Sequence, residues 1–140
     1  MDTNFNTQSK RSPEELLLDF MDAIWKPPYN LDKIDGFVTE DYTLYSSGNI
    51  IEGRDSYIEW AKEFHKKLIG ATTDTRDIIY NESENKVVSR WVCHGKNNGI
   101  FDLSPDGKPI SFTGIAIWEI KDNLLSKCWV ERGNYKFNPS

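Results

Sequence analysis

The apolar residues in the first third of the chain repeat with the period of an α-helix. Ser12, Pro13 and Glu15 predict a helix start, because serine caps, proline suits the first helical position and glutamate completes a capping box. Lys26-Pro27-Pro28 ends this helix, since proline removes a backbone donor. The helical stripe between these signals consists of Leu16, Leu17, Phe20, Met21 and Ile24.

Two further helices are expected before the sheet. A shorter one begins at Asn30. A third, of roughly 15 residues, follows Gly53 and ends at Gly70, with Tyr57, Ala61, Phe64 and Leu68 on one face.

After Gly70 the apolar period changes from about 3.6 to 2, which indicates β-strands. Short polar turns separate the strands, and Asp122-Asn123 is typical of a tight hairpin. Tyr42–Tyr45 is a short additional strand. Helices followed by an antiparallel meander indicate the α+β class. The four long strands are expected over Thr72–Tyr80, Lys86–Lys96, Pro109–Ile120 and Leu124–Phe137.

The expected architecture is a cone-shaped α+β barrel, in which three N-terminal helices pack on a strongly curved antiparallel sheet. Gly95, Gly99 and Gly114 fall in or beside strands, where glycine often marks a bend or bulge. Residues 12–140 are expected to form a single domain. Residues 1–11 are polar and without period, so we expect a flexible tail.

Composition narrows the function classes. The net charge of −5 and a pI near 5.0 argue against a nucleic-acid partner. No apolar run is long enough to span a membrane, and no signal-peptide pattern opens the chain, so no membrane partner is expected. Two cysteines, Cys93 and Cys128, are too few for a disulfide framework, which makes the cytoplasm the expected location.

No cofactor and no metal are expected. The two histidines, His65 and His94, do not stand at metal-ligand spacing, and the chain contains no phosphate loop or dinucleotide fingerprint. Aromatic residues make up 13% of the chain. They predict either a bulky core or the lining of a small-molecule cavity.

Several local patterns, in this order and spacing, resemble one family. The chain is similar to the SnoaL-like polyketide cyclase branch of the nuclear-transport-factor-2-like superfamily. The resemblance implies a cone with a pocket, often a homodimer through the outer face of the sheet, and in characterised members a buried carboxylate as acid/base without a cofactor. The patterns are Ile51–Asp55, Val88–Trp91 followed by Gly95 and Gly99, Ile100–Lys108, and Gly114–Ile120 followed by Asp122-Asn123 and Trp129.

The chain departs from the family pattern at two positions. Gly133 stands where the cyclases usually carry a catalytic aspartate, four residues after the tryptophan of the last strand. Asn97 stands where a histidine is common between two glycines.

Glu131 is the predicted catalytic residue. Alternate residues of a strand share a face, so if Gly133 faces the cavity, then Trp129, Glu131 and Tyr135 do too. A carboxylate among aromatic rings would have a raised pKa, in the range useful for acid/base work. In the alternative reading, Glu131 pairs with Arg90 or Arg132 as a structural salt bridge.

The predicted pocket residues are all aromatic, and helical or strand periodicity explains several of them equally well as core. Arg90 is either a carboxylate clamp or half of an ion pair on the outer face. The predicted lining consists of Trp25, Tyr45, Trp60, Trp91, Trp118, Trp129 and Tyr135.

Three functions remain open. The first is a cofactor-independent isomerase, cyclase or hydrolase acting on a small hydrophobic molecule. The second is a non-catalytic domain that binds such a molecule and has lost the acid/base residues. The third is a dimerisation module whose cone is filled by side chains.

Overall fold

A computed structural model describes residues 11–137, so the predicted tail lies almost entirely outside the described residues. Its last residue, Arg11, is described, and its guanidinium donates to the Gly36 carbonyl at 2.8 Å. The elements, in order, are α2 (Pro13–Ile24), the 3-10 helix η1 (Leu31–Gly36), β1 (Val38–Ser46), β2 (Asn49–Glu52), α3 (Arg54–Lys67), β3 (Leu68–Asn81), β4 (Lys86–Asn97), the 3-10 helix η2 (Ile100–Asp102), β5 (Pro109–Lys121) and β6 (Leu124–Phe137).

The predicted capping box at the start of α2 is confirmed. The Glu15 backbone N–H donates to the Ser12 hydroxyl at 3.1 Å, and the Ser12 backbone N–H donates to the Glu15 carboxylate at 2.8 Å. Pro13 occupies the first helical position. Because both orphan donors are satisfied, α2 has a fixed entry point, and its apolar stripe is directed to the core.

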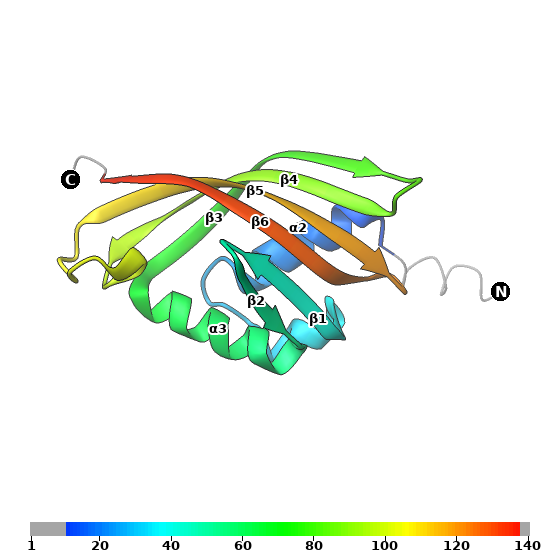
Figure 1. The fold of residues 1–140 in the computed structure, drawn as a ribbon, viewed down its shortest axis with the longest axis horizontal. Coiled ribbons are helices and arrows are strands. Elements are labelled where there is room, and N and C mark those ends of the chain that lie inside the picture. Colours follow the sequence, from blue (N-terminus) through cyan, green and yellow to red (C-terminus); the bar gives the residue numbers. More distant parts are fainter. Residues whose placement is uncertain (1–10, 138–140) are drawn as a thin grey trace.

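Six strands form one sheet in the order β2-β1-β6-β5-β4-β3 (Figure 1). The predicted antiparallel meander from β3 to β6 is confirmed. The Asp122-Asn123 hairpin is also present, with both residues at positive φ. β1, which contains the predicted strand Tyr42–Tyr45, extends this meander because it pairs parallel with β6 and antiparallel with β2.

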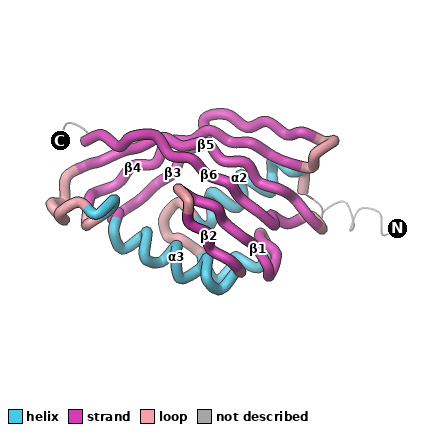
Figure 2. The backbone as a smooth tube through the Cα atoms, in the orientation of Figure 1, coloured by secondary structure: helices cyan, strands magenta, loops and turns pink. Residues whose placement is uncertain are grey.

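The helical part differs from the prediction. The second helix is a six-residue 3-10 helix, η1. The strand predicted at Tyr42–Tyr45 is present but longer, as β1, and β2 follows it before α3 (Figure 2). Gly36 is a poor helix residue, and the β-branched pair Val38-Thr39 favours a strand at once. The fold is α+β, with a six-stranded sheet and few helices.

α2 and α3 lie on the same side of the sheet (Figure 1). We call the covered side the inner face and the opposite side the outer face. Along β4 the buried side chains Val87, Ser89, Trp91 and Cys93 alternate with more exposed ones, so the core lies between the helices and the inner face. Within residues 11–137, no helix is long and apolar enough to cross a membrane.

Candidate functional site

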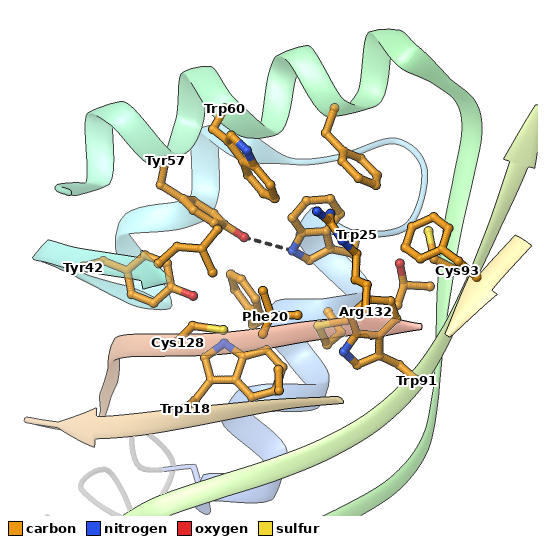
Figure 3. A pocket seen from close by; sticks show the side chains of 17 residues that line it. Phe20, Trp25, Tyr42, Tyr57, Trp60, Trp91, Cys93, Trp118, Cys128 and Arg132 are labelled. Carbon is orange, nitrogen blue, oxygen red and sulfur yellow. Dashed lines mark hydrogen bonds between the residues drawn. The ribbon is translucent and has the colours of Figure 1, made fainter. Parts of the chain in front are cut away.

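A cavity of about 60 Å³ lies between α2, α3 and the inner face of the sheet (Figure 3). Aromatic rings form most of its wall, and they pack edge to face: the Trp25 ring lies 5.3 Å from Phe64 and 5.9 Å from Trp60, centroid to centroid. The wall is therefore apolar and shaped by large rings. The aromatic residues are Phe20, Trp25, Tyr42, Tyr57, Trp60, Phe64, Trp91, Phe112 and Trp118.

The register of β5 and β6 decides which side chains reach the cavity. Trp118 lies opposite Cys128, Ala116 opposite Val130, and Gly114 opposite Arg132. Opposite residues share a face, and all of these but Gly114 line the cavity.

Gly114 serves a packing role. A Cβ atom there would come within 2.3 Å of the Trp91 ring. Glycine thus allows the indole of Trp91 to lie across β5 and form part of the wall. The bulge expected at this glycine is present beside it, as a register shift between Phe112 and Gly114.

Two buried tyrosines place hydroxyl groups in the lining. The Trp25 indole N–H donates to the Tyr57 hydroxyl at 3.0 Å. Burial raises the pKa of Tyr57 and of Tyr42 well above the usual value, so both remain neutral hydrogen-bond donors.

The indole N–H of Trp118 is buried without a hydrogen-bond partner among the described residues. The Tyr42 hydroxyl interacts weakly with it, outside the geometry of a full hydrogen bond, and the Cys128 thiol lies beside them (Figure 3). Buried donors are nearly always paired, so this N–H is available to an acceptor in the cavity.

Both cysteines are free thiols in the lining. Burial raises the pKa of Cys93 to about 11 and raises that of Cys128 further. Neither is a thiolate near neutral pH, so nucleophilic cysteine chemistry is disfavoured.

Among the described residues, Arg132 is the one charged residue of the lining. It is half-buried, burial lowers its pKa, and its guanidinium carbon lies 5.6 Å from the centre of the Phe101 ring. Within residues 11–137 it forms no ion pair with a carboxylate. By contrast, Arg90 pairs with Asp77 at 2.7 Å on the outer face, so the ion-pair interpretation of Arg90 is confirmed.

Four of the predicted pocket residues line the cavity: Trp25, Trp60, Trp91 and Trp118. They come from four different elements or their ends, and the structure brings them together around one space (Figure 3).

The prediction that Glu131 faces the cavity is wrong, as are those for Trp129 and Tyr45. In β6 the inward residues are Cys128, Val130 and Arg132, so Trp129 and Glu131 point to the outer face, where Trp129 stacks on Tyr45 at 5.5 Å. The premise about position 133 causes the error. A Cβ atom at Gly133 would lie 2.7 Å from the hydroxyl of exposed Thr113, on the outer face.

Glu131 is also absent from the ion pairs of residues 11–137, so the alternative salt bridge with Arg90 or Arg132 does not form either. The sequence does contain a signal for the correct orientation of β6. Charged Lys127 and Glu131 alternate with apolar Cys128 and Val130, which places the apolar residues on the inner face.

Tyr135 lies on the inner side but outside the cavity lining. A bulge between the pairs Gly114–Arg132 and Phe112–Tyr135 shifts the alternation, so Tyr135 lies opposite buried Phe112. Its ring stacks on Phe101 at 5.5 Å, beside the cavity rather than in its lining.

The structure explains Asn97 as an anchor of the loop after β4. Its carboxamide oxygen accepts from the Gly99 and Ile100 backbone N–H groups, and its nitrogen donates to the Ser104 carbonyl and the Asp106 carboxylate. The side chain is 1% exposed. It has no access to the cavity.

Sequence reasoning missed Arg132 and Tyr42 as cavity residues. The Tyr29 hydroxyl donates to the Ala71 carbonyl at 2.7 Å. In the described part of the chain, no group of three or more His, Cys, Asp or Glu side chains is gathered that could hold a metal ion.

Comparison with known proteins places the fold. Residues 17–127 match the model of the SnoaL-like domain, and the chain belongs to this family, within the nuclear-transport-factor-2-like superfamily. No curated protein was found to be similar in sequence.

Solved structures share the fold at low identity. A proposed SnoaL-like polyketide cyclase from Jannaschia sp. CCS1 has a TM-score of 0.76 and 15% identity, over 88% of this chain and 90% of that one. A proposed polyketide cyclase from Acidithiobacillus ferrooxidans has a TM-score of 0.75 and 20% identity, over 85% and 86%. AclR, a proposed hydroxylase from Streptomyces galilaeus, has a TM-score of 0.71 and 19% identity, over 86% and 74%. Such identities show the fold alone.

Proposed function

We propose that this protein binds a small hydrophobic ring compound in the cavity between α2, α3 and the sheet. The proposal rests on an aromatic wall that holds two donors without a full hydrogen bond to an acceptor among residues 11–137: the Trp118 N–H and the Arg132 guanidinium. Unpaired buried donors are unfavourable, so a ligand acceptor gives them a purpose. We propose that this cavity is the ligand pocket of the cone-shaped barrel expected from the sequence.

The cavity size limits the ligand. About 60 Å³ holds a few water molecules, whereas roughly 150 Å³ is needed to admit benzene. A ring therefore enters only when lining side chains rotate. Trp25, Trp60, Phe64 and Arg132 retain some exposure, and they are the side chains with room to move.

Binding is favoured over carboxylate acid/base catalysis. None of the lining residues in the described part of the chain is Asp, Glu or His, and the two thiols and two tyrosines are neutral. The lining residues can pack against a ring and donate hydrogen bonds to its oxygen atoms, but they do not include a base for proton transfer.

A cofactor-independent isomerase, cyclase or hydrolase is the second candidate, and Tyr57 favours it. Its hydroxyl accepts from Trp25, which orients its own proton for donation to a developing oxyanion. Tyr57→Phe should then abolish turnover of any substrate found while retaining its binding. Unchanged turnover in this variant would exclude Tyr57 as the proton donor.

A thermal-shift panel of one-ring and two-ring compounds tests the binding function. A bound compound raises the melting temperature, because it binds only the folded state. Ala116→Leu fills the cavity from β5 and should remove the shift, whereas Thr113→Leu, on the outer face of the same strand, should keep it. If no compound in the panel shifts the melting temperature, the binding function is contradicted. The dimerisation module whose cone is filled by side chains then remains.

We also propose a homodimer through the outer face, and a cytoplasmic location. Cross-strand pairs align one apolar row over all six strands, and large aliphatic side chains in it remain exposed. The free, buried thiols suit a reducing compartment. The row consists of Ile79, Val88, Ile117, Trp129, Tyr45 and Ile50.

A further inference from the structure

Arg132 has surroundings that no other lining residue shares. Its side chain extends from β6 into the aromatic cavity (Figure 3). The groups that act on the guanidinium are the Phe101 ring, the Cys93 thiol, which is neutral because burial raises its pKa to about 11, and, beyond ion-pair distance, the Glu131 carboxylate. Glu131, its neighbour in sequence, points to the outer face. The positive charge is thus held against apolar surface, and among residues 11–137 no carboxylate lies within ion-pair distance of it, although Glu131 attracts it from farther away.

A guanidinium in this position is costly unless acceptors complete it. Arginine stays protonated even where burial lowers its pKa, and its planar fork matches the two oxygens of a carboxylate. The contact with Phe101 supplies only a cation–π attraction, which is weaker than a charge-assisted pair of hydrogen bonds. A ligand carboxylate would therefore displace the ring as the partner of Arg132.

We propose that the ligand is a small aromatic carboxylate, whose ring lies against the cavity wall and whose carboxylate forms a bidentate pair with Arg132. This inference rests on the proposed binding function and adds the chemical class of the ligand. The whole chain carries a net charge of −5, which disfavours anions in general. The expected preference for a ligand with a carboxylate is therefore assigned to Arg132 alone.

The test compares benzoate with benzamide at pH 7, because the two share a ring and shape and differ in charge. Four of the five tryptophans line the cavity, so quenching of intrinsic fluorescence reports binding. We expect benzoate to bind the wild-type protein about tenfold more tightly than benzamide, which corresponds to one strong charged interaction.

Arg132→Gln should remove this preference, with benzamide affinity unchanged within about twofold. Arg132→Lys keeps the charge but lacks the fork, so it should retain part of the preference. Arg90→Gln is the matched control, because Arg90 lies on the outer face and is paired with Asp77. Melting temperatures of all variants verify the fold, and Arg132→Lys carries the test if Arg132→Gln does not fold.

Each outcome has one meaning. Equal binding of the two probes overturns the carboxylate inference and leaves the proposed function standing. A benzoate preference that is undiminished in every Arg132 variant that folds, or that falls equally in Arg90→Gln, overturns the assignment to Arg132. If neither probe binds, the proposed function fails, and the inference fails with it.

Discussion

At the residue scale, Asn97 shows how a departure from a family pattern acquires a structural meaning. The family resemblance made it a lost histidine, but its carboxamide makes four hydrogen bonds that hold residues 99–106 in place. That loop carries Phe101, the ring beneath Arg132. The residue therefore supports the cavity from outside rather than acting within it.

Asn97→Ala should lower the free energy of unfolding by about 2–4 kcal/mol. The change removes several hydrogen bonds and leaves the Gly99 and Ile100 N–H groups without their acceptor. Urea denaturation measures the loss. Asn98→Ala removes one exposed hydrogen bond to the Lys66 carbonyl and should cost less than about 1 kcal/mol. Equal losses in the two variants would contradict the role of Asn97 as an anchor.

Gly114→Ala should destabilise the protein by about 1–3 kcal/mol, because its Cβ atom overlaps the Trp91 indole. Trp91→Phe removes the ring atoms that the Cβ meets. In a double-mutant cycle the two changes should therefore couple favourably, with the double variant more stable than the sum of single losses predicts. Additive losses would show that Trp91 is not the obstacle.

At the scale of elements, periodicity predicted what depends on neighbours in sequence. The cap of α2, the four long strands and their hairpins were predictable because each is set by local residues. The parallel pairing of β1 with β6 and the bulge before Tyr135 were not, since both depend on partners far along the chain. Periodicity also assigned the wrong face of β6 to the cavity. For this reason Glu131 was predicted to line it and Arg132 was not.

A histidine near the end of α3, His65, is half-buried among aromatic rings. The His65 ring stacks on Tyr29 at 4.0 Å and meets the edge of Trp25 at 5.1 Å, and its Nε2 atom has no partner among the described residues. Burial lowers the pKa of His65 to about 4, against 6.5 in the unfolded chain. Protonation is thus disfavoured in the folded state.

The free energy of unfolding should therefore fall as the pH is lowered from about 6.5 to about 4. In this window the unfolded chain binds a proton that the folded protein excludes, so acid favours unfolding. His65→Phe keeps an aromatic ring in the stack and should reduce this pH dependence. His94→Gln, which changes the exposed histidine beside Asp74, should retain it. Denaturant midpoints at several pH values provide the measurement. If stability depends on pH equally in the wild type and in His65→Phe, the role assigned to His65 is refuted.

At the scale of the whole molecule, the two faces of the sheet divide the aromatic residues between two tasks. Trp25, Trp60, Trp91 and Trp118 shape the cavity, whereas Trp129 lies in the apolar row of the outer face. Charges flank this row on both sides: Arg90 and Glu131 lie opposite Ile115, and Lys86 and Lys127 lie opposite Glu119. Both signs are present, so a second copy related by a two-fold axis can place opposite charges together.

Ile117→Glu should convert the proposed dimer to a monomer, because it puts a charge in the middle of the apolar row. Light scattering after size exclusion measures the mass. Ile69→Glu is the matched control: Ile69 is equally an exposed isoleucine, 50% exposed against 39% for Ile117, but lies outside the row and should leave the dimer intact. A wild-type monomer at micromolar concentration, or a dimeric Ile117→Glu variant, would exclude this interface.

Of the five tryptophans, only Trp129 should gain exposure in the monomer, so its fluorescence emission should shift to the red. Binding of a cavity ligand, which the other four tryptophans report, should stay unchanged.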